Sequence, residues 1–186
     1  FWRMNSAGQV CISPKRFIVH RSVLEPFTKG VLEFVKNIEM GYEVDVDAEL
    51  EKYLTSDFSK FSGQRMVMNS LISQRAAEEV EAQVEKTAAQ GAEILIGGKR
   101  KGSFYEPTIL THVTKDMDVM KDMEIFGPVM PICAFDTAEE AVEIANQSCY
   151  GLSGCVFTKD WKKGMEISRQ IQSGTVVVNG TGTYRN

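Results

Sequence analysis

The feature that most limits the possible folds is a regular alternation of strand-like and helix-like segments in the second half of the chain. Strand-sized apolar runs occur at residues 92–98, 106–113, 129–137, 153–160 and 175–179, and helix patterns occupy residues 137–147 and 161–174. Strands that alternate with helices over short connections pair mostly in parallel, because each helix carries the chain back across the sheet. We therefore predict an α/β fold, with a layered, largely parallel sheet flanked by helices.

The first half of the chain is predicted to add a strand at residues 15–20 and helices at residues 22–40 and 73–91. Residues 42–67 are the least regular part. The segment is longer than ordinary connections, so we predict a surface insertion that can include one short helix.

The predicted helices also carry end signals. Ser73 is a candidate N-cap and Gly91 a candidate terminator of the helix at residues 73–91. Thr137, with Glu140 three residues later, forms a capping-box pattern. Asp160 is a candidate cap for the helix at residues 161–174, which Gly174 is predicted to close.

Composition excludes several classes of protein. Among 186 residues, 43% are hydrophobic and 25% are charged, which is typical of a globular domain with its own core. The net charge of −4, without a block of Lys and Arg, argues against nucleic acid as a partner. The longest apolar runs are strand-sized, too short to span a membrane. Four cysteines without a C-x-x-C pair argue against a metal site and against a disulfide framework, so we expect a reduced, cytoplasmic protein.

The segment "GQVC" at residues 8–11 places a cysteine just before the predicted strand at residues 15–20. A thiolate is a strong nucleophile, and backbone N–H groups near it can also stabilise a developing oxyanion. Gly8 allows a tight bend before Cys11. Taken alone the pattern is weak, because a cysteine beside a strand is more often a buried packing residue. Packing is the role we predict for the remaining cysteines: Cys133, Cys149 and Cys155.

Further motifs follow Cys11 along nearly the whole chain, apart from residues 42–67. They read "FYEPTIL" at residues 104–110, "EIFGPV" at residues 124–129, "YGL" at residues 150–152 and "SGTVVVNGTG" at residues 173–182. In this order, and with "GQVC" before them, the motifs resemble the aldehyde dehydrogenase superfamily. The resemblance implies that residues 1–186 form the family's cysteine-bearing catalytic domain, excised without its dinucleotide-binding domain.

The resemblance implies roles for four residues. Cys11 matches the family's catalytic cysteine, whose thiolate attacks the aldehyde carbon to give a thiohemiacetal; hydride then passes to NAD or NADP, and water hydrolyses the resulting thioester. Glu124 matches the carboxylate that accepts hydrogen bonds from the nicotinamide ribose, although by composition alone it reads as a solvated surface acid. Phe126 matches an aromatic residue beside the nicotinamide. Asn179 matches an asparagine near the substrate tunnel, and a structural capping role is equally open.

Other polar residues near these motifs receive no catalytic role. Lys15 and Arg16 are interpreted as surface charges or structural hydrogen-bond donors. His20 and His112 lie at predicted strand ends without an acidic partner nearby in the sequence.

The resemblance also places essential parts of the family's machinery outside these residues: the general-base glutamate, the dinucleotide-binding domain, the oxyanion-hole asparagine and the oligomerisation strand. We therefore expect the chain alone not to oxidise an aldehyde with NAD or NADP. We expect the parent protein to be a homodimer or homotetramer acting on a small aldehyde.

The substrate is the least determined point. The segment "GQVCISPKRFIV" most resembles bacterial succinate-semialdehyde dehydrogenases, a likeness that gives only an analogy for the substrate. A broad-specificity or lactaldehyde-type enzyme, an enzyme that passes the acyl group to coenzyme A, and a non-catalytic assembly module remain alternatives. Two departures from the family pattern, Ser6 and "MNSLIS" at residues 68–73, leave the subfamily open.

Overall fold

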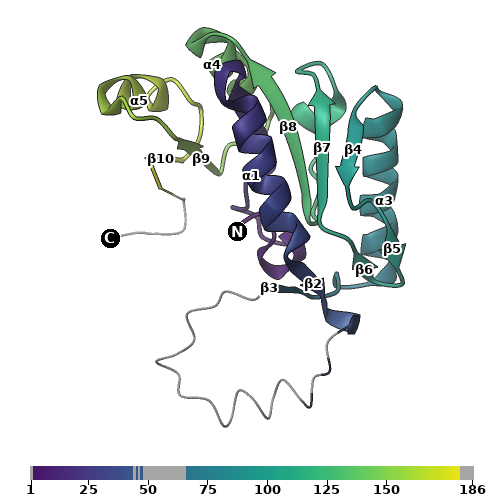
Figure 1. The fold of residues 1–186 in the computed structure, drawn as a ribbon. Helices are drawn as coiled ribbons and strands as arrows, with labels where there is room; N and C mark the ends of the chain where they lie inside the picture. Colours follow the sequence, from purple (N-terminus) through teal and green to yellow (C-terminus); the bar gives the residue numbers. More distant parts are fainter. Residues whose placement is uncertain (1, 44, 46, 48–65, 181–186) are drawn as a thin grey trace, which may run out of the picture.

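The main sheet lies at the centre of the computed structural model, which describes residues 2–43, 45, 47 and 66–180 (Figure 1). Its strand order is β1-β8-β7-β4. Strands β1 and β7 run parallel to β8, and β4 pairs antiparallel with β7. This mixed, mostly parallel sheet confirms the predicted α/β class. The bounds are Phe17–His20 for β1, Val129–Phe135 for β8, Thr108–Val113 for β7 and Glu93–Ile96 for β4.

Three smaller strand pairs surround the main sheet. Strands β9 and β10 pair in parallel, as do β2 and β3, whereas β5 and β6 pair antiparallel. The hairpin of β5 and β6 was not predicted, since two-residue strands carry no readable periodicity. The bounds are Ser153–Val156 for β9, Thr175–Val178 for β10, Ile38–Met40 for β2, Met66–Met68 for β3, Arg100–Lys101 for β5 and Phe104–Tyr105 for β6.

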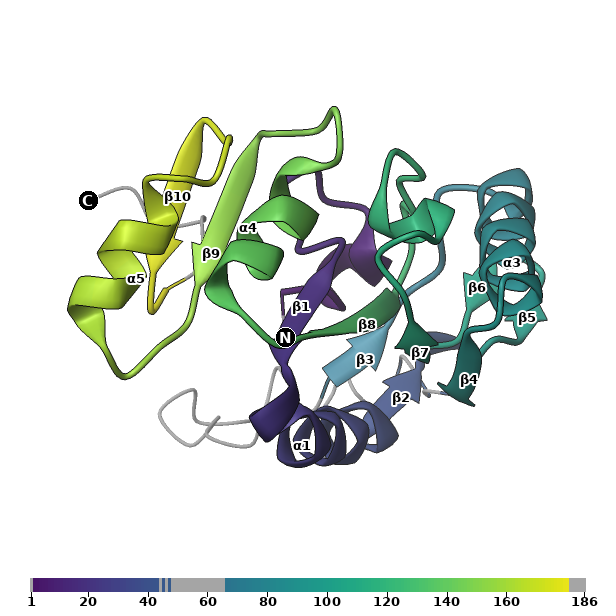
Figure 2. The same ribbon diagram turned by 90° about the horizontal axis from the view of Figure 1, so that it is seen from above.

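Helices cover both faces of the main sheet. Figure 2 shows α1 (Leu24–Lys36) on one face, and α3 (Gln74–Ala89) and α4 (Ala138–Asn146) on the other. Helix α5 (Trp161–Ser168) packs on β9 and β10 instead. None of the helices in the described ranges is long and apolar enough to cross a membrane.

The three predicted N-caps are confirmed. The Ser73 hydroxyl accepts from the backbone N–H of Ala76, and the Asp160 carboxylate accepts from that of Lys163, each at 3.1 Å. Thr137 accepts from the N–H of Glu140 at 3.2 Å. The Glu140 carboxylate reaches back to the N–H of Asp136, one residue before the cap. These ends are specified by local chemistry, which is why the sequence shows them.

Two predicted helices end earlier than their patterns indicate. Helix α1 stops at Lys36 because Ile38–Met40 pair with β3. Because of that pairing, residues 66 and 67 belong to β3 and not to the insertion predicted at residues 42–67. Residues 48–65, for which a short helix was predicted as possible, lie outside the described residues. Helix α5 stops at Ser168, and Asn146 holds the backbone that follows: its Nδ2 donates to the carbonyl of Gln170 and its Oδ1 accepts from the N–H of Gln172. Gly174 therefore does not close the helix; its N–H donates to the carbonyl of Gly151.

The cysteines differ in exposure, and all four are free thiols. Cys133, on β8, is buried as predicted, and Cys155, on β9, is partly buried. The packing prediction is wrong for Cys149, which is exposed; it lies in a bend before β9, where its backbone N–H donates to Asp122.

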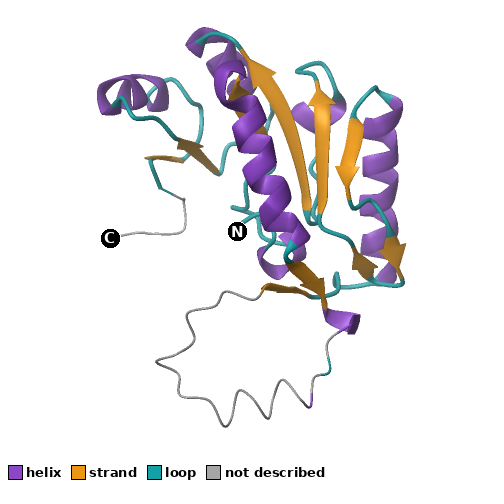
Figure 3. Cartoon of the chain, viewed as in Figure 1, coloured by secondary structure: helices purple, strands orange, loops and turns teal. Residues whose placement is uncertain are grey.

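The last part of the described chain forms a small C-terminal layer of residues 150–179, which contains β9, α5 and β10. Figure 3 shows this layer to one side of the main sheet. Several of its large apolar side chains are exposed, including Leu152 at 57%, Phe157 at 69% and Trp161 at 57%.

Candidate active site

The backbone before Cys11 makes a left-handed turn. Ser6, Ala7 and Gly8 have φ values of 50°, 53° and 74°, a region that residues with a Cβ rarely adopt. A Cβ at position 8 would fall on the backbone carbonyl of Gly127, far inside van der Waals contact. The cysteine loop (residues 5–15) and the glutamate loop (residues 121–128) therefore touch backbone to backbone, which is possible only with glycine at position 8.

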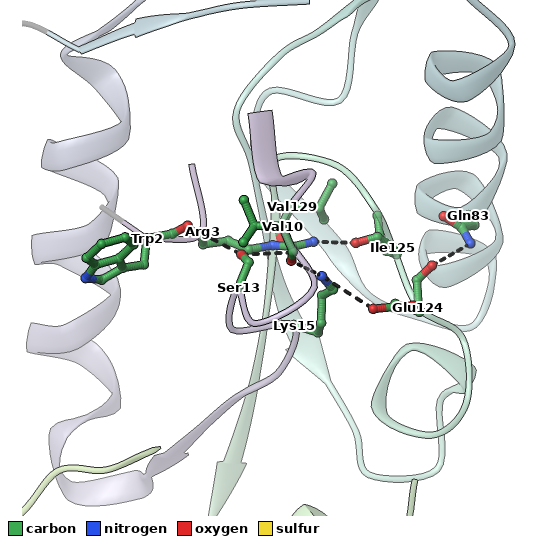
Figure 4. Close-up of polar contacts among 9 residues, drawn as sticks. All are labelled: Trp2, Arg3, Val10, Ser13, Lys15, Gln83, Glu124, Ile125 and Val129. Atoms are coloured by element: carbon green, nitrogen blue, oxygen red, sulfur yellow. Dashed lines mark hydrogen bonds and ion pairs between the residues drawn. The ribbon is translucent and has the colours of Figure 1, made fainter. Parts of the chain in front are cut away.

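A buried arginine reinforces this contact (Figure 4). The side chain of Arg3 donates from Nε to the carbonyl of Val129 and from Nη2 to that of Ile125, both at 2.6 Å. Its Nη1 donates to the hydroxyl of Ser13 at 3.3 Å. Burial lowers the pKa of Arg3 to about 9, and the charge of Glu124 opposes that shift. The guanidinium thus keeps its proton at neutral pH and joins the two loops.

A second cation, Lys15, lies at the front of the same junction (Figure 4). Its ammonium donates to the carbonyl of Val10 at 2.8 Å and lies 3.4 Å from Oε1 of Glu124. It also stands 4.2 Å from the centre of the Phe126 ring, within cation–π range. With 16% of the side chain exposed, Lys15 is a structural donor and not the surface charge that was the other interpretation.

Burial and neighbouring charges shift the pKa of Lys15. Burial is the main cause that lowers the pKa of Lys15, and the nearby Arg3 charge adds to it. The charges of Glu124 and Cys11 act in the opposite direction. Lys15 is thus within electrostatic reach of both predicted site residues, one from each loop.

The glutamate loop presents its side chains outward while its backbone is held. The carbonyl of Glu124 accepts from Nε2 of Gln83 on α3 at 3.1 Å, and Gly127 packs on Val80 of the same helix so closely that a Cβ would lie 2.6 Å from its side chain. The Glu124 side chain remains 27% exposed and Phe126 41% exposed. Cys11 is exposed as well. The three side chains are therefore accessible from solvent on two mutually fixed loops.

Gln9 connects the cysteine loop to the segment before α3. Its side-chain oxygen accepts from the N–H of Ile72 at 2.8 Å, and its Nε2 donates to the carbonyl of Ser6 at 2.9 Å. The glutamine of the "GQVC" motif thus fixes the entry to the turn.

Asn179 lies in the C-terminal layer. Its Oδ1 accepts from the N–H of Thr158 at 2.9 Å, and its Nδ2 donates to the carbonyl of Thr158 at 2.8 Å. The N–H of Asn179 donates to Val156. These bonds close the ends of β9 and β10 and support the structural role; a substrate role for Asn179 stays a prediction.

The remaining polar residues have structural partners. Arg16 donates to the carbonyls of Met120, Ile144 and Ala145, which confirms it as a structural donor. His112 lies 3.2 Å from Glu93 across the β4–β7 pair, a partner that short sequence separations could not show. In residues 2–43, 45, 47 and 66–180, no group of three His, Cys, Asp or Glu side chains could hold a metal ion.

Sequence reasoning missed the role of Arg3, and for Lys15 it left both a surface charge and a structural donor open. Arg3 stands among aromatic and apolar residues in "FWRMN", and a charge in such a setting is a signal of a buried, fully hydrogen-bonded group. Lys15 carries no comparable signal, because its partners on the glutamate loop are more than a hundred positions away.

Comparison with known proteins gives a consistent result. The model of the aldehyde dehydrogenase family matches residues 1–186. The 3-sulfolactaldehyde dehydrogenase of Priestia megaterium is 35% identical over 181 residues, which cover 97% of this chain and 34% of that protein. Succinate-semialdehyde dehydrogenase (NADP(+)) 2 of Schizosaccharomyces pombe is 35% identical over 181 residues, covering 95% of this chain and 33% of that protein.

A solved structure shows the same fold. The crystal structure of lactaldehyde dehydrogenase from Escherichia coli superposes with a TM-score of 0.82 at 29% identity, covering 98% of this chain and 35% of that one. The chain thus spans about a third of the length of the proteins it matches.

Proposed function

The chain belongs to the aldehyde dehydrogenase family, and on that premise we propose that it supplies the thiol-bearing part of an enzyme that oxidises an aldehyde to its acid with NAD or NADP. The observation that carries the proposal is the backbone contact between Gly8 and Gly127, which holds the loop of Cys11 against the loop of Glu124. A nucleophile and an acceptor for a cofactor sugar are thereby presented together, as such an enzyme requires.

The accessible side chains fit a nicotinamide nucleotide. The Glu124 carboxylate offers only acceptors, and its two oxygens have more lone pairs than the contact of Oε1 with Lys15 uses, so acceptor sites remain for the two hydroxyls of a ribose. The Phe126 ring, 41% exposed beside it, offers an apolar face for a flat ring. Glu124 and Phe126 are therefore the residues that would hold this part of NAD or NADP. When bound, the cofactor would accept a hydride from the substrate carbon.

Cys11 would perform the covalent chemistry. Its thiolate sulfur bonds to the aldehyde carbon while the carbonyl oxygen takes up a proton, which gives a thiohemiacetal. After this carbon has lost a hydride and its hydroxyl group has lost a proton to water, the acyl group remains on Cys11 as a thioester. Water then adds to the thioester carbon, the acid leaves, and the Cys11 thiol is restored. Exposure of Cys11 allows an aldehyde to reach it.

We propose a short aldehyde with an anionic group as the substrate, with succinate semialdehyde as the first choice. Two relatives support this class, since succinate semialdehyde and 3-sulfolactaldehyde, named for them, carry a carboxylate and a sulfonate. Lactaldehyde, named for the matched crystal structure, is the uncharged competitor. A cytoplasmic location, supported by four free cysteines, and assembly into a homodimer or homotetramer complete the proposal.

The test is an assay of the full-length protein that carries this chain. It is supplied with each of the three aldehydes and with NAD+ or NADP+, in the presence and absence of coenzyme A, and reduced cofactor and acid are measured. We expect activity without coenzyme A, loss of activity in Cys11→Ala, and retained activity in Cys149→Ala, which removes the other exposed thiol. Activity that requires coenzyme A would favour an acylating enzyme. No activity with any aldehyde would favour a non-catalytic assembly module.

A further inference from the structure

Lys15, at the end of the cysteine loop, contacts Val10 of its own loop and Glu124 of the glutamate loop. The chemistry outlined above gives Lys15 no role. We propose that Lys15 is a positioning residue, which holds the Glu124 carboxylate and the Phe126 ring in a fixed relation to the backbone that carries Cys11. The inference rests on the proposed function, because it assigns a purpose to the fixed Glu124 and Phe126.

The Lys15 ammonium has three different neighbours. Its Nζ donates to the carbonyl of Val10, the residue before Cys11, at 2.8 Å. The same Nζ lies 3.4 Å from Oε1 of Glu124 and 4.2 Å from the centre of the Phe126 ring. The ammonium, which has donors and no acceptor, thus makes one hydrogen bond, one ion pair and one cation–π contact.

The surroundings make these contacts stronger than those of a surface lysine. The side chain of Lys15 is 16% exposed, so little water competes for the ammonium. Arg3, the other cation of the junction, points to the carbonyls of Ile125 and Val129 and repels Lys15. Glu124 thus provides the carboxylate that compensates the positive charge of Lys15. A neutral residue at position 15 would leave this carboxylate free to rotate.

The arrangement leads to a specific kinetic consequence. Because Lys15 engages Oε1 of Glu124, the rest of the carboxylate keeps one orientation before the cofactor arrives. Loss of Lys15 should then weaken binding of the cofactor. The covalent chemistry at Cys11 should depend far less on Lys15. The expected signature is a change in KM for NAD+ or NADP+ with little change in kcat.

The experiment uses the full-length protein and compares Lys15→Met, Lys15→Arg and the matched control Lys162→Met. Lys162 is an exposed lysine on α5. We expect Lys15→Met to raise KM for the cofactor about tenfold with kcat within about threefold of wild type, as for loss of a charge-assisted contact. Lys15→Arg, which keeps the charge and the contact with Phe126, should recover most of the loss. Lys162→Met should behave as wild type.

A double-mutant cycle with Glu124→Gln separates positioning from a general structural effect. If Lys15 acts through Glu124, Lys15→Met changes KM by less than about twofold in the Glu124→Gln background. An equal change in both backgrounds, or a wild-type KM in Lys15→Met, overturns the proposal while the dehydrogenase activity of the wild type still stands.

Failure of the proposed function would look different, since the wild type itself would show no turnover. In that case amide hydrogen exchange of residues 5–15 and 121–128 decides the role of Lys15. Faster exchange in both segments for Lys15→Met, but not for Lys162→Met, supports positioning; unchanged exchange overturns it.

Discussion

The junction of the cysteine and glutamate loops and the C-terminal layer are built in opposite ways. At the junction, polar groups are buried and paired: Arg3, 2% exposed, reaches two carbonyls, and Gly8 lies on Gly127. In the C-terminal layer, apolar side chains such as Phe157 and Trp161 are exposed. The difference teaches that the candidate site owes its geometry to backbone contact and buried cations within this chain, and not to the layer that carries Asn179.

The largest effect is expected from Gly8→Ala, which breaks the backbone contact of the junction. A Cβ would meet the carbonyl of Gly127, and φ of 74° is strained for alanine. We expect the free energy of unfolding to fall by about 3–5 kcal/mol, measured by urea denaturation. The control is Gly30→Ala in α1, where a Cβ would meet no atom within 4 Å. That change should be neutral or stabilising by about 0.5–1 kcal/mol; equal effects at both positions would contradict the comparison.

The next largest effect is expected from Arg3→Met, which preserves much of the side-chain volume but removes the buried donors. The carbonyls of Ile125 and Val129 would lose their donor in a place without water, at a cost of about 2–4 kcal/mol in the free energy of unfolding. Urea denaturation measures the loss. Arg21→Met provides the contrast, because Arg21 pairs with Asp136 at the exposed surface and should matter little. A stable Arg3→Met protein would show that the junction holds without its buried cation.

The smallest effect concerns Asp122, which connects the glutamate loop to the bend that leads into the C-terminal layer. The carboxylate accepts from the N–H of Cys149 at 2.7 Å, and the hydrogen bonds from Cys149 hold the pKa of Asp122 below its usual range. A carboxyl whose pKa is lower in the folded state stabilises the fold above its unfolded-state pKa, and this contribution is lost as the pH falls through the folded-state value.

Asp122→Asn tests this connection, since asparagine does not titrate. The variant should be less stable than wild type near neutral pH, and the difference should shrink between about pH 6 and about pH 2. Urea denaturation at a series of pH values measures it. A difference that does not depend on pH would mean that the carboxylate charge contributes nothing to the connection.

The elements that could be predicted from the sequence are those specified by local chemistry. Ser73, Thr137 and Asp160 cap their helices through bonds to residues three positions away, so a short window of sequence contains the whole interaction. The parallel pair of β9 and β10, which are joined through α5, follows in the same way from the alternation of strand and helix. Cys11, Glu124 and Phe126 were predicted as site residues through the resemblance of their motifs to a family, and the structure places them on adjoining loops; their roles stay predictions.

The features that could not be predicted depend on distant partners. Helix α1 ends early because Met40 pairs with Met68, across a segment with no readable pattern. Cys149 is exposed in a bend whose backbone Asp122 holds, and nothing near Cys149 in the sequence indicates this distant partner. For Lys15 the sequence left a surface charge and a structural donor open, because the carboxylate that decides between them, Glu124, is distant in the sequence.

The left-handed turn at Ser6–Gly8 has a consequence for how such a site can change over generations. Contact between two main chains leaves no side chain that could be exchanged in small steps, so any residue at position 8 other than glycine meets the same obstacle. Val10 and Ile12, whose side chains take no part in that contact, are free of this constraint. Variation around Cys11 should therefore accumulate in neighbouring side chains, while the alignment of the two loops stays the same.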